Sequence, residues 1–191
     1  MKILYIDAGP RSSSRTRRLA DALISHLEGD ADYLRLIDAD LPRTDEAAIN
    51  RRYIDAKNND FSAPVYELAK QFASADVIVI AAPFWDMSFP AVLKQYIEAV
   101  TVAGITFRYT SEGIPKGLCK AKELYYITTA GGPVFNEEYG CGYIRMMSQG
   151  MYGIPGFHSF RAENLDIAGA DVEGILRQAE DEIAEAVGGI D

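Results

Sequence analysis

The chain has 191 residues, which is enough for one domain with a sizeable core, and its 25% charged and 48% hydrophobic residues are typical of globular proteins. Its 19 Lys and Arg against 28 Asp and Glu leave a net charge of −9, which would repel the phosphate backbone of a nucleic acid. Because no membrane span or signal peptide is evident either, we expect a cytoplasmic single domain over residues 1–191 that binds neither nucleic acid nor a membrane.

The first predicted element is a strand over residues 2–8, followed by an amphipathic helix with Leu19, Leu23 and Leu27 on one face. The loop between them is rich in hydroxyl and guanidinium groups, contributed by Arg11, Ser12, Ser13, Ser14, Arg15 and Thr16. With the free N–H groups and the positive dipole of the helix start, these side chains form a candidate phosphate site. The alternative is that one hydroxyl only caps the helix. The sequence patterns of a nucleoside-triphosphate loop and of a Rossmann dinucleotide turn are missing.

The middle of the chain predicts the centre of a parallel sheet. A second strand over residues 33–37, a helix within 44–56 at a mobile surface and a helix from Pro64 come first. The β-branched run over residues 77–80 then predicts a strand that is covered on both faces, and Pro90 begins the next helix. The loop between them holds four large apolar side chains where α/β proteins bind ligands, unless these only cover the sheet.

The remaining elements repeat the alternation. After the segment 105–110 and a connection over 112–122, a strand over residues 123–129 ends in Ala130-Gly131-Gly132-Pro133. Paired glycines allow a flat ligand to approach the backbone, although an ordinary turn would also contain them. A weak helical pattern over 139–150, a strand over 157–161 and a helix capped by Asp171 complete the chain.

Five strands that alternate with helices predict a flavodoxin-like doubly wound parallel sheet, with the order 2-1-3-4-5 and helices on both faces. In this order the carboxyl ends of the first, third and fourth strands lie side by side. The hydroxyl-rich loop, the aromatic loop and the glycine pair therefore converge on one site. A phosphate pocket, an aromatic slot and a glycine-lined edge together match flavin mononucleotide (FMN).

The residue counts argue against metal or hydrolase chemistry. The two cysteines and two histidines are too few and too widely separated for a zinc site, so we expect no metal. A catalytic triad could use only His158, and no GxSxG elbow accompanies it.

Four stretches resemble the FMN-dependent NADH:quinone oxidoreductases known as azoreductases: SRTRRLADAL, PFWDMSFPAVLKQYIEAV, AGITFRYTSEGIPKGL and ITTAGG. The resemblance implies a flavodoxin-like fold and a homodimer with two FMN sites at its interface. It further implies that NADH or NADPH reduces the flavin, which then reduces quinones or azo compounds in a ping-pong cycle. Because the flavin itself carries the chemistry, no catalytic side chain is required.

The resemblance also implies the roles of individual residues. The expected cofactor-binding residues are Arg11, Ser14, Arg15, Thr16, Pro83, Phe84, Trp85, Asp86, Met87, Thr129, Ala130, Gly131 and Gly132. The expected substrate-binding residues are Trp85, Phe107 and Tyr109. Asp86 and Ala130 stand where the family usually has asparagine and often has arginine, which leaves the substrate and the nucleotide preference open.

Two other functions remain compatible with the same residues. One is a flavodoxin-like FMN electron carrier, which the acidic charge would suit, and the other is a regulatory FMN-binding module without substantial turnover. The residues 106–117 favour an enclosed two-electron site over the carrier. The physiological acceptor is not predicted, nor is the physiological importance of azo reduction.

Overall fold

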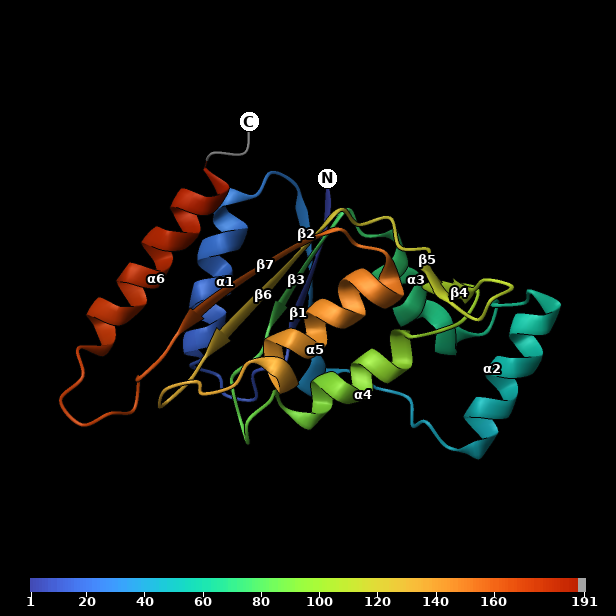
Figure 1. Cartoon of the computed structure of the whole chain (residues 1–191), viewed down its shortest axis with the longest axis horizontal. Helices are drawn as coiled ribbons and strands as arrows, with labels where there is room; N and C mark the ends of the chain where they lie inside the picture. The colour runs from blue at the N-terminus through green and yellow to red at the C-terminus, as the bar shows by residue number, and fades with distance from the viewer. Residues whose placement is uncertain (189–191) are drawn as a thin grey trace.

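In the computed structural model, which describes residues 1–188, a parallel sheet of five strands forms the centre of the molecule (Figure 1). The five strands are β1 (Lys2–Asp7), β2 (Asp30–Arg35), β3 (Val77–Ala81), β6 (Glu123–Thr129) and β7 (Gly156–Ala162). Their order across the sheet is β2-β1-β3-β6-β7. Every neighbouring pair is parallel, so all five carboxyl ends lie at one edge.

Helices cover both faces of this sheet (Figure 1). The α-helices are α1 (Arg15–His26), α2 (Glu46–Asn58), α3 (Glu67–Ser74), α4 (Ala91–Val100), α5 (Tyr143–Met146) and α6 (Val172–Val187). Helices α1 and α6 pack together on one face, while α3, α4 and α5 lie on the other. The flavodoxin-like α/β architecture with a five-stranded parallel sheet is therefore confirmed.

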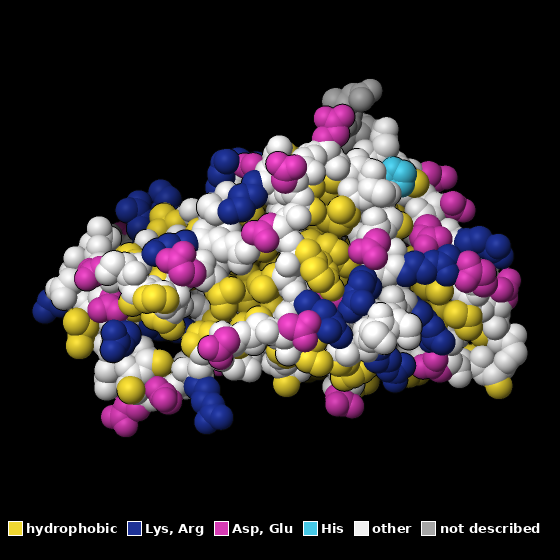
Figure 2. Space-filling view, turned by 180° about the vertical axis from the view of Figure 1, so that it is seen from behind, with side chains coloured by type: hydrophobic (Ala, Val, Ile, Leu, Met, Phe, Trp, Pro, Cys, Tyr) yellow, Lys and Arg dark blue, Asp and Glu magenta, His cyan; other side chains and the backbone are white. Residues whose placement is uncertain are grey.

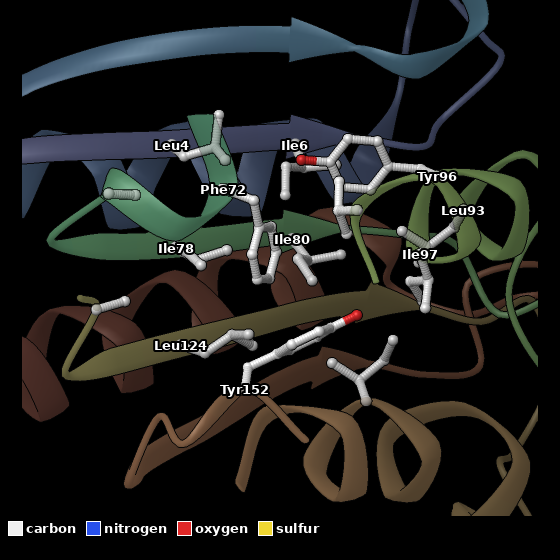
Figure 3. Packing of buried hydrophobic residues seen from close by; sticks show 14 of the residues in the cluster. Leu4, Ile6, Phe72, Ile78, Ile80, Leu93, Tyr96, Ile97, Leu124 and Tyr152 are labelled. Atoms are coloured by element: carbon white, nitrogen blue, oxygen red, sulfur yellow. The ribbon is translucent and has the colours of Figure 1, made fainter. Parts of the chain in front are cut away.

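Strand β3 is the buried centre predicted from its β-branched run, because all five of its residues are buried. Its alternate side chains enter two cores. Ile78 and Ile80 belong to the larger core, which Phe72, Tyr96 and Tyr152 fill from the surrounding segments (Figure 3). The remaining strand residues face α1 and α6. Both faces of the central strands are dry, as a parallel sheet requires.

Several element predictions need correction. Strand β2 spans Asp30–Arg35 instead of 33–37, because Leu36 turns into the core within a short 3-10 helix, η1 (Leu36–Asp38). An unpredicted antiparallel pair, β4 (Phe107–Tyr109) and β5 (Pro115–Gly117), lies between β3 and β6 in the chain. The predicted order 2-1-3-4-5 counted only five strands, so its numbering does not match the seven strands of the structure.

Two predicted helices are more complex than their sequence patterns indicated. The helix expected from Pro64 begins as a 3-10 turn, η2 (Pro64–Tyr66), before α3. The helix expected over 139–150 consists of α5 between two π-helical segments, η3 (Glu138–Gly142) and η4 (Met147–Tyr152). The wider π turns let Cys141 and Tyr152 reach the core, which the apolar spacing of a regular α-helix does not indicate.

Helix α2 stands apart from the layers, at the end of the molecule farthest from α6 (Figure 1). None of its residues is buried. Two side-chain hydrogen bonds attach it, one from Arg52 Nη1 to the carbonyl oxygen of Glu98 (2.8 Å) and one from Tyr66 Oη to Asp55 Oδ2 (2.7 Å). Within residues 1–188, no helix is both long and apolar enough to span a bilayer.

The surface carries charges of both signs. In Figure 2, which shows the molecule from behind, Lys and Arg side chains lie among Asp and Glu side chains, with hydrophobic side chains exposed between them. No large basic surface is visible on this face.

Candidate functional site

The loops that follow β1, β3 and β6 surround a cleft of about 370 Å³ at the carboxyl edge of the sheet. Ten of the predicted cofactor-binding residues line it, namely Arg11, Ser14, Arg15, Thr16, Pro83, Phe84, Trp85, Thr129, Ala130 and Gly131. The three loops thus lie together as the topology predicted. Ser13 of the predicted phosphate loop also lines the cleft, and Gly9, Pro10, Leu165 and Asp166, which were not predicted to bind the cofactor, complete the lining.

The loop after β1 presents a row of backbone donors at the start of α1. The Ser14 hydroxyl caps this helix by accepting a hydrogen bond from the N–H of Arg17 (3.2 Å). Between residues 11 and 16, no backbone N–H donates to any group in the described part of the chain. Free N–H groups and the positive end of the helix dipole together favour an anion. The cap and the predicted anion site therefore coexist.

A buried carboxylate beneath this loop fixes its conformation. Asp7, the last residue of β1, accepts hydrogen bonds from the N–H of Gly9 (2.8 Å), from Tyr33 Oη (2.7 Å) and from Arg17 Nε (2.7 Å). A second guanidinium nitrogen of Arg17 also lies 2.7 Å from Asp7. Burial and the hydrogen bond to Asp7 raise the pKa of Tyr33 to about 12, so the phenol remains a donor.

Arg17 carries the constraint from Asp7 to the loop itself. Its guanidinium donates to the carbonyl oxygens of Ser12 (3.0 Å) and Arg11 (3.3 Å). Because these carbonyls point to Arg17, they do not point into the cleft, where they would repel an anion. The sequence signal for Asp7 is an acidic residue at the end of an apolar strand, and this signal alone predicts no role for it.

Two threonines meet at the floor of the cleft. The hydroxyl oxygens of Thr16 and Thr129 are 2.6 Å apart, and both side chains are buried. One hydroxyl hydrogen forms the bond between them. The other has no acceptor among residues 1–188, so the pair can still donate one hydrogen bond. A buried donor without an acceptor is costly, which favours a ligand oxygen in the cleft.

The two arginines of the loop, Arg11 and Arg15, differ in whether their guanidinium groups are already paired. Arg15 donates to Asp166 Oδ1 (2.7 Å) and to the carbonyl oxygen of Leu165 (3.1 Å), so it connects α1 to the segment after β7. Arg11 is exposed, and no carboxylate within residues 1–188 pairs with it. Arg11 is therefore the arginine that is more available to bind an anion in the cleft. From the sequence, Arg15, together with Ser14 and Thr16, is expected to hold the phosphate, and Arg11 is a further candidate.

The aromatic loop contains a tight two-residue turn. The N–H groups of Trp85 and Ser88 donate to each other's carbonyl oxygens, at 3.0 and 2.8 Å. Asp86 and Met87, at the centre of the turn, have φ angles of 49° and 66°, the pattern of a type I′ turn. The turn holds Asp86 and Met87 beyond the lining of the cleft, while Phe84 and Trp85 remain within it.

The two glycines of the edge differ in their surroundings. A Cβ added at Gly131 would lie 2.4 Å from Asp166 Oδ2, so a larger residue would displace the partner of Arg15. At Gly132, by contrast, an added Cβ would meet nothing within 4 Å, and this residue does not line the cleft. Ala130 is buried, and its N–H donates to the carbonyl oxygen of Ala162 (2.9 Å).

The two further substrate-binding candidates, Phe107 and Tyr109, lie outside the cleft, in β4. Their rings meet edge to face with centroids 5.2 Å apart. Tyr109 is 59% exposed, but Phe107 is only 6% exposed. Phe107, expected to bind substrate, is therefore a buried residue in this chain, because Thr106 and Phe107 turn back into its core.

Comparison with known proteins agrees with this geometry. Residues 1–187 match the protein family described as having a flavodoxin-like fold. The FMN-dependent NADH:quinone oxidoreductase 2 of Clostridium acetobutylicum is 40% identical over 189 residues, covering 92% of each chain. The FMN-dependent NADH:quinone oxidoreductase of Clostridium beijerinckii is 36% identical over 192 residues, covering 96% of each chain.

A solved structure is similar as well. The crystal structure of an azoreductase from Bacillus anthracis superposes with a TM-score of 0.82. It is 25% identical in sequence, and the match covers 97% of this chain and 98% of that one.

The strained turn gives a prediction for stability. Met87 is exposed and long, so it gains little from burial at a positive φ that glycine adopts freely. Met87→Gly should therefore raise the free energy of unfolding by roughly 0.5–1 kcal/mol, measured by urea denaturation. Asp86→Gly is the matched control and should have a smaller effect, because aspartate tolerates this conformation better. A less stable Met87→Gly protein would contradict the prediction.

Proposed function

Because the chain belongs to the flavodoxin-like fold family, we propose that it is an FMN-dependent NADH:quinone oxidoreductase, with azo compounds as further acceptors. The proposal rests mainly on one observation, that three features line the same cleft. These are the unpaired backbone N–H groups of residues 11–16, the hydroxyl pair of Thr16 and Thr129, which can still donate one hydrogen bond, and the aromatic side chains of Phe84 and Trp85. Relatives that are 40% and 36% identical over nearly the whole chain have this activity in their names.

The phosphate end of FMN fits the loop after β1. The N–H groups of residues 11–16, the Arg11 guanidinium and the hydroxyl of Ser14 are donors suited to a phosphate dianion. The Thr16 and Thr129 pair supplies the buried hydrogen that needs an acceptor. In this proposal Arg15 supports the cleft wall through Asp166 instead of binding the phosphate.

The ring end fits the other two loops. Pro83, Phe84 and Trp85 offer an apolar wall, and Ala130 and Gly131 line the same cleft. Asp86, Met87 and Gly132 remain in the proposed cofactor set as residues of the rim. When bound, FMN would supply the two-electron chemistry, and the protein would orient it and limit the access of water. The proposed electron donor is NADH or NADPH. A cytoplasmic location is also part of the proposal.

A homodimer is the second part of the proposal. Trp85 exposes a large apolar side chain beside the cleft. The neighbouring Tyr139 is exposed too, and its carbonyl oxygen accepts a hydrogen bond from Ser88 Oγ (2.5 Å). A second copy that covers this rim would bury these side chains and could bring its own Tyr109 to the shared site. This would give Tyr109 the substrate role that its position in one chain does not support.

Reduction by pyridine nucleotide tests the proposed reaction. NADH, mixed anaerobically with the FMN-loaded protein, should bleach the flavin absorbance, and added benzoquinone should restore it, because the enzyme needs both half-reactions. Dithionite serves as the control that the flavin can be reduced. An electron carrier would respond to dithionite but hardly to NADH or NADPH, and this result would refute the oxidoreductase.

Arginine substitutions test the phosphate site. Arg11→Ala should weaken FMN binding by roughly 10- to 150-fold, since a hydrogen bond to a charged group contributes about 1.5–3 kcal/mol. Arg15→Ala should weaken it less than about 5-fold, because an exposed ion pair contributes about 0–1 kcal/mol. Quenching of flavin fluorescence measures both affinities. Riboflavin, which lacks the phosphate, should bind both variants like the unchanged protein. A larger loss in Arg15→Ala than in Arg11→Ala would reverse the assignment.

Sedimentation equilibrium at micromolar concentration tests the assembly. The protein should sediment at twice the chain mass, because the exposed rim needs a cover. Trp85→Lys should shift it towards the monomer by placing a charge in the interface, whereas Ile49→Lys on the distant α2 should not. A monomer with full quinone turnover would contradict the proposed dimer, because each chain would then contain a complete site.

A further inference from the structure

Two side chains of the edge strand β2 support the loop that precedes α1. Tyr33 and Arg35 lie on the same face of this strand, because they are two residues apart. Tyr33 donates to Asp7, the residue of β1 that pairs in register with Arg35. Arg35 itself contacts the loop, since its Nη2 donates to the carbonyl oxygen of Pro10 (3.1 Å). Strand β2 therefore supports the loop indirectly through Asp7 and directly through Pro10.

Three successive carbonyl oxygens of the loop, those of residues 10–12, accept hydrogen bonds from guanidinium groups. Arg35 holds the first, and Arg17 holds the other two. The three peptide bonds are trans, so each N–H of residues 11–13 points away from the carbonyl oxygen of its own peptide group. Neither Arg17 nor Arg35 lines the cleft. The two arginines thereby orient three consecutive N–H groups away from themselves, and successive N–H groups that point the same way bind anions.

These two guanidinium groups add little net charge to the site. Arg17 pairs with the buried carboxylate of Asp7, and Arg35 Nη1 pairs with Asp38 Oδ2 (2.9 Å). Each positive charge is thus balanced by a carboxylate within hydrogen-bonding distance. Arg11, by contrast, lines the cleft without a carboxylate partner among residues 1–188. The contribution of Arg17 and Arg35 to anion binding is therefore geometric instead of electrostatic.

We propose that Arg35, acting together with Arg17, is a positioning residue that makes the cleft selective for a flavin that carries a phosphate. It touches neither the phosphate nor the ring, and it acts by holding the peptide group between Pro10 and Arg11. Without this hydrogen bond the peptide group can rotate and turn its oxygen towards the phosphate. Only the fraction of molecules with the N–H facing the phosphate then binds FMN with full affinity. The inference rests on the proposed function, which supplies FMN as the ligand.

The affinities of Arg35→Met for FMN and for riboflavin test the proposal. Methionine keeps an unbranched stem but has no donor, so the contact with Pro10 is lost. FMN binding should weaken about 2- to 12-fold, which corresponds to one ordinary hydrogen bond. Riboflavin, which has no phosphate, should bind the variant and the unchanged protein equally, as measured by quenching of flavin fluorescence. Unchanged FMN affinity would overturn the proposal. An equal loss of riboflavin affinity would do so too, because a general disturbance of the fold affects both flavins.

Two further variants separate geometry from charge. Arg18→Met removes a positive charge from α1, but Arg18 pairs with two glutamates of α6 and not with the loop. Asp38→Asn removes the carboxylate that balances Arg35. Neither change removes a donor to the carbonyl oxygens of residues 10–12, so FMN affinity should stay unchanged in both. If Arg18→Met loses as much affinity as Arg35→Met, or if Asp38→Asn binds FMN more tightly, charge alone determines the affinity and the proposal is overturned.

Inorganic phosphate separates this inference from the proposed function. Phosphate should shift the amide resonances of residues 11–13 in the unchanged protein and should bind Arg35→Met more weakly. If it does so but NADH does not reduce the flavin, the oxidoreductase assignment fails and the positioning role stands. If NADH reduces the flavin but Arg35→Met binds FMN as tightly as the unchanged protein, the positioning role alone fails. Thermal unfolding verifies that all three variants fold.

Discussion

The candidate site depends on one buried carboxylate. Asp7 ends the strand β1 and has no exposed surface, so its charge must be compensated inside the protein. Arg17, Gly9 and Tyr33 supply that compensation, and the first two belong to the loop and helix that form the cleft. The requirement to satisfy Asp7 therefore fixes the loop. The directions of the loop carbonyls, and hence the free N–H groups, follow from it.

The elements with strong local signals could be predicted from the sequence. The unbroken β-branched run of β3, the leucine spacing of α1 and the Asp171 cap of α6 each define their element by short-range chemistry. The convergence of three loops was predictable for a different reason. In a parallel sheet with helical connections, all carboxyl ends share one edge, so the topology alone brings Thr16 to Thr129.

Features that depend on long-range packing could not be predicted. Arg15 pairs with Asp166, 151 residues later, and no pattern in the loop reveals that partner. The burial of Phe107 results from a three-residue strand too short for a period-2 signal. Asp86 and Met87 form their turn without the Asn-Gly signature of type I′.

The isolation of α2 divides the molecule into parts of unequal local stability. None of the helix's own side chains is buried, so opening it costs mainly its backbone hydrogen bonds and the contacts of Arg52 and Asp55. Its amide hydrogens should accordingly exchange with solvent through local fluctuations. Those of β1 and β3 are released only by global unfolding. A protease should therefore cleave the chain first between β2 and α3, far from the cofactor cleft. Cleavage there would leave the sheet intact.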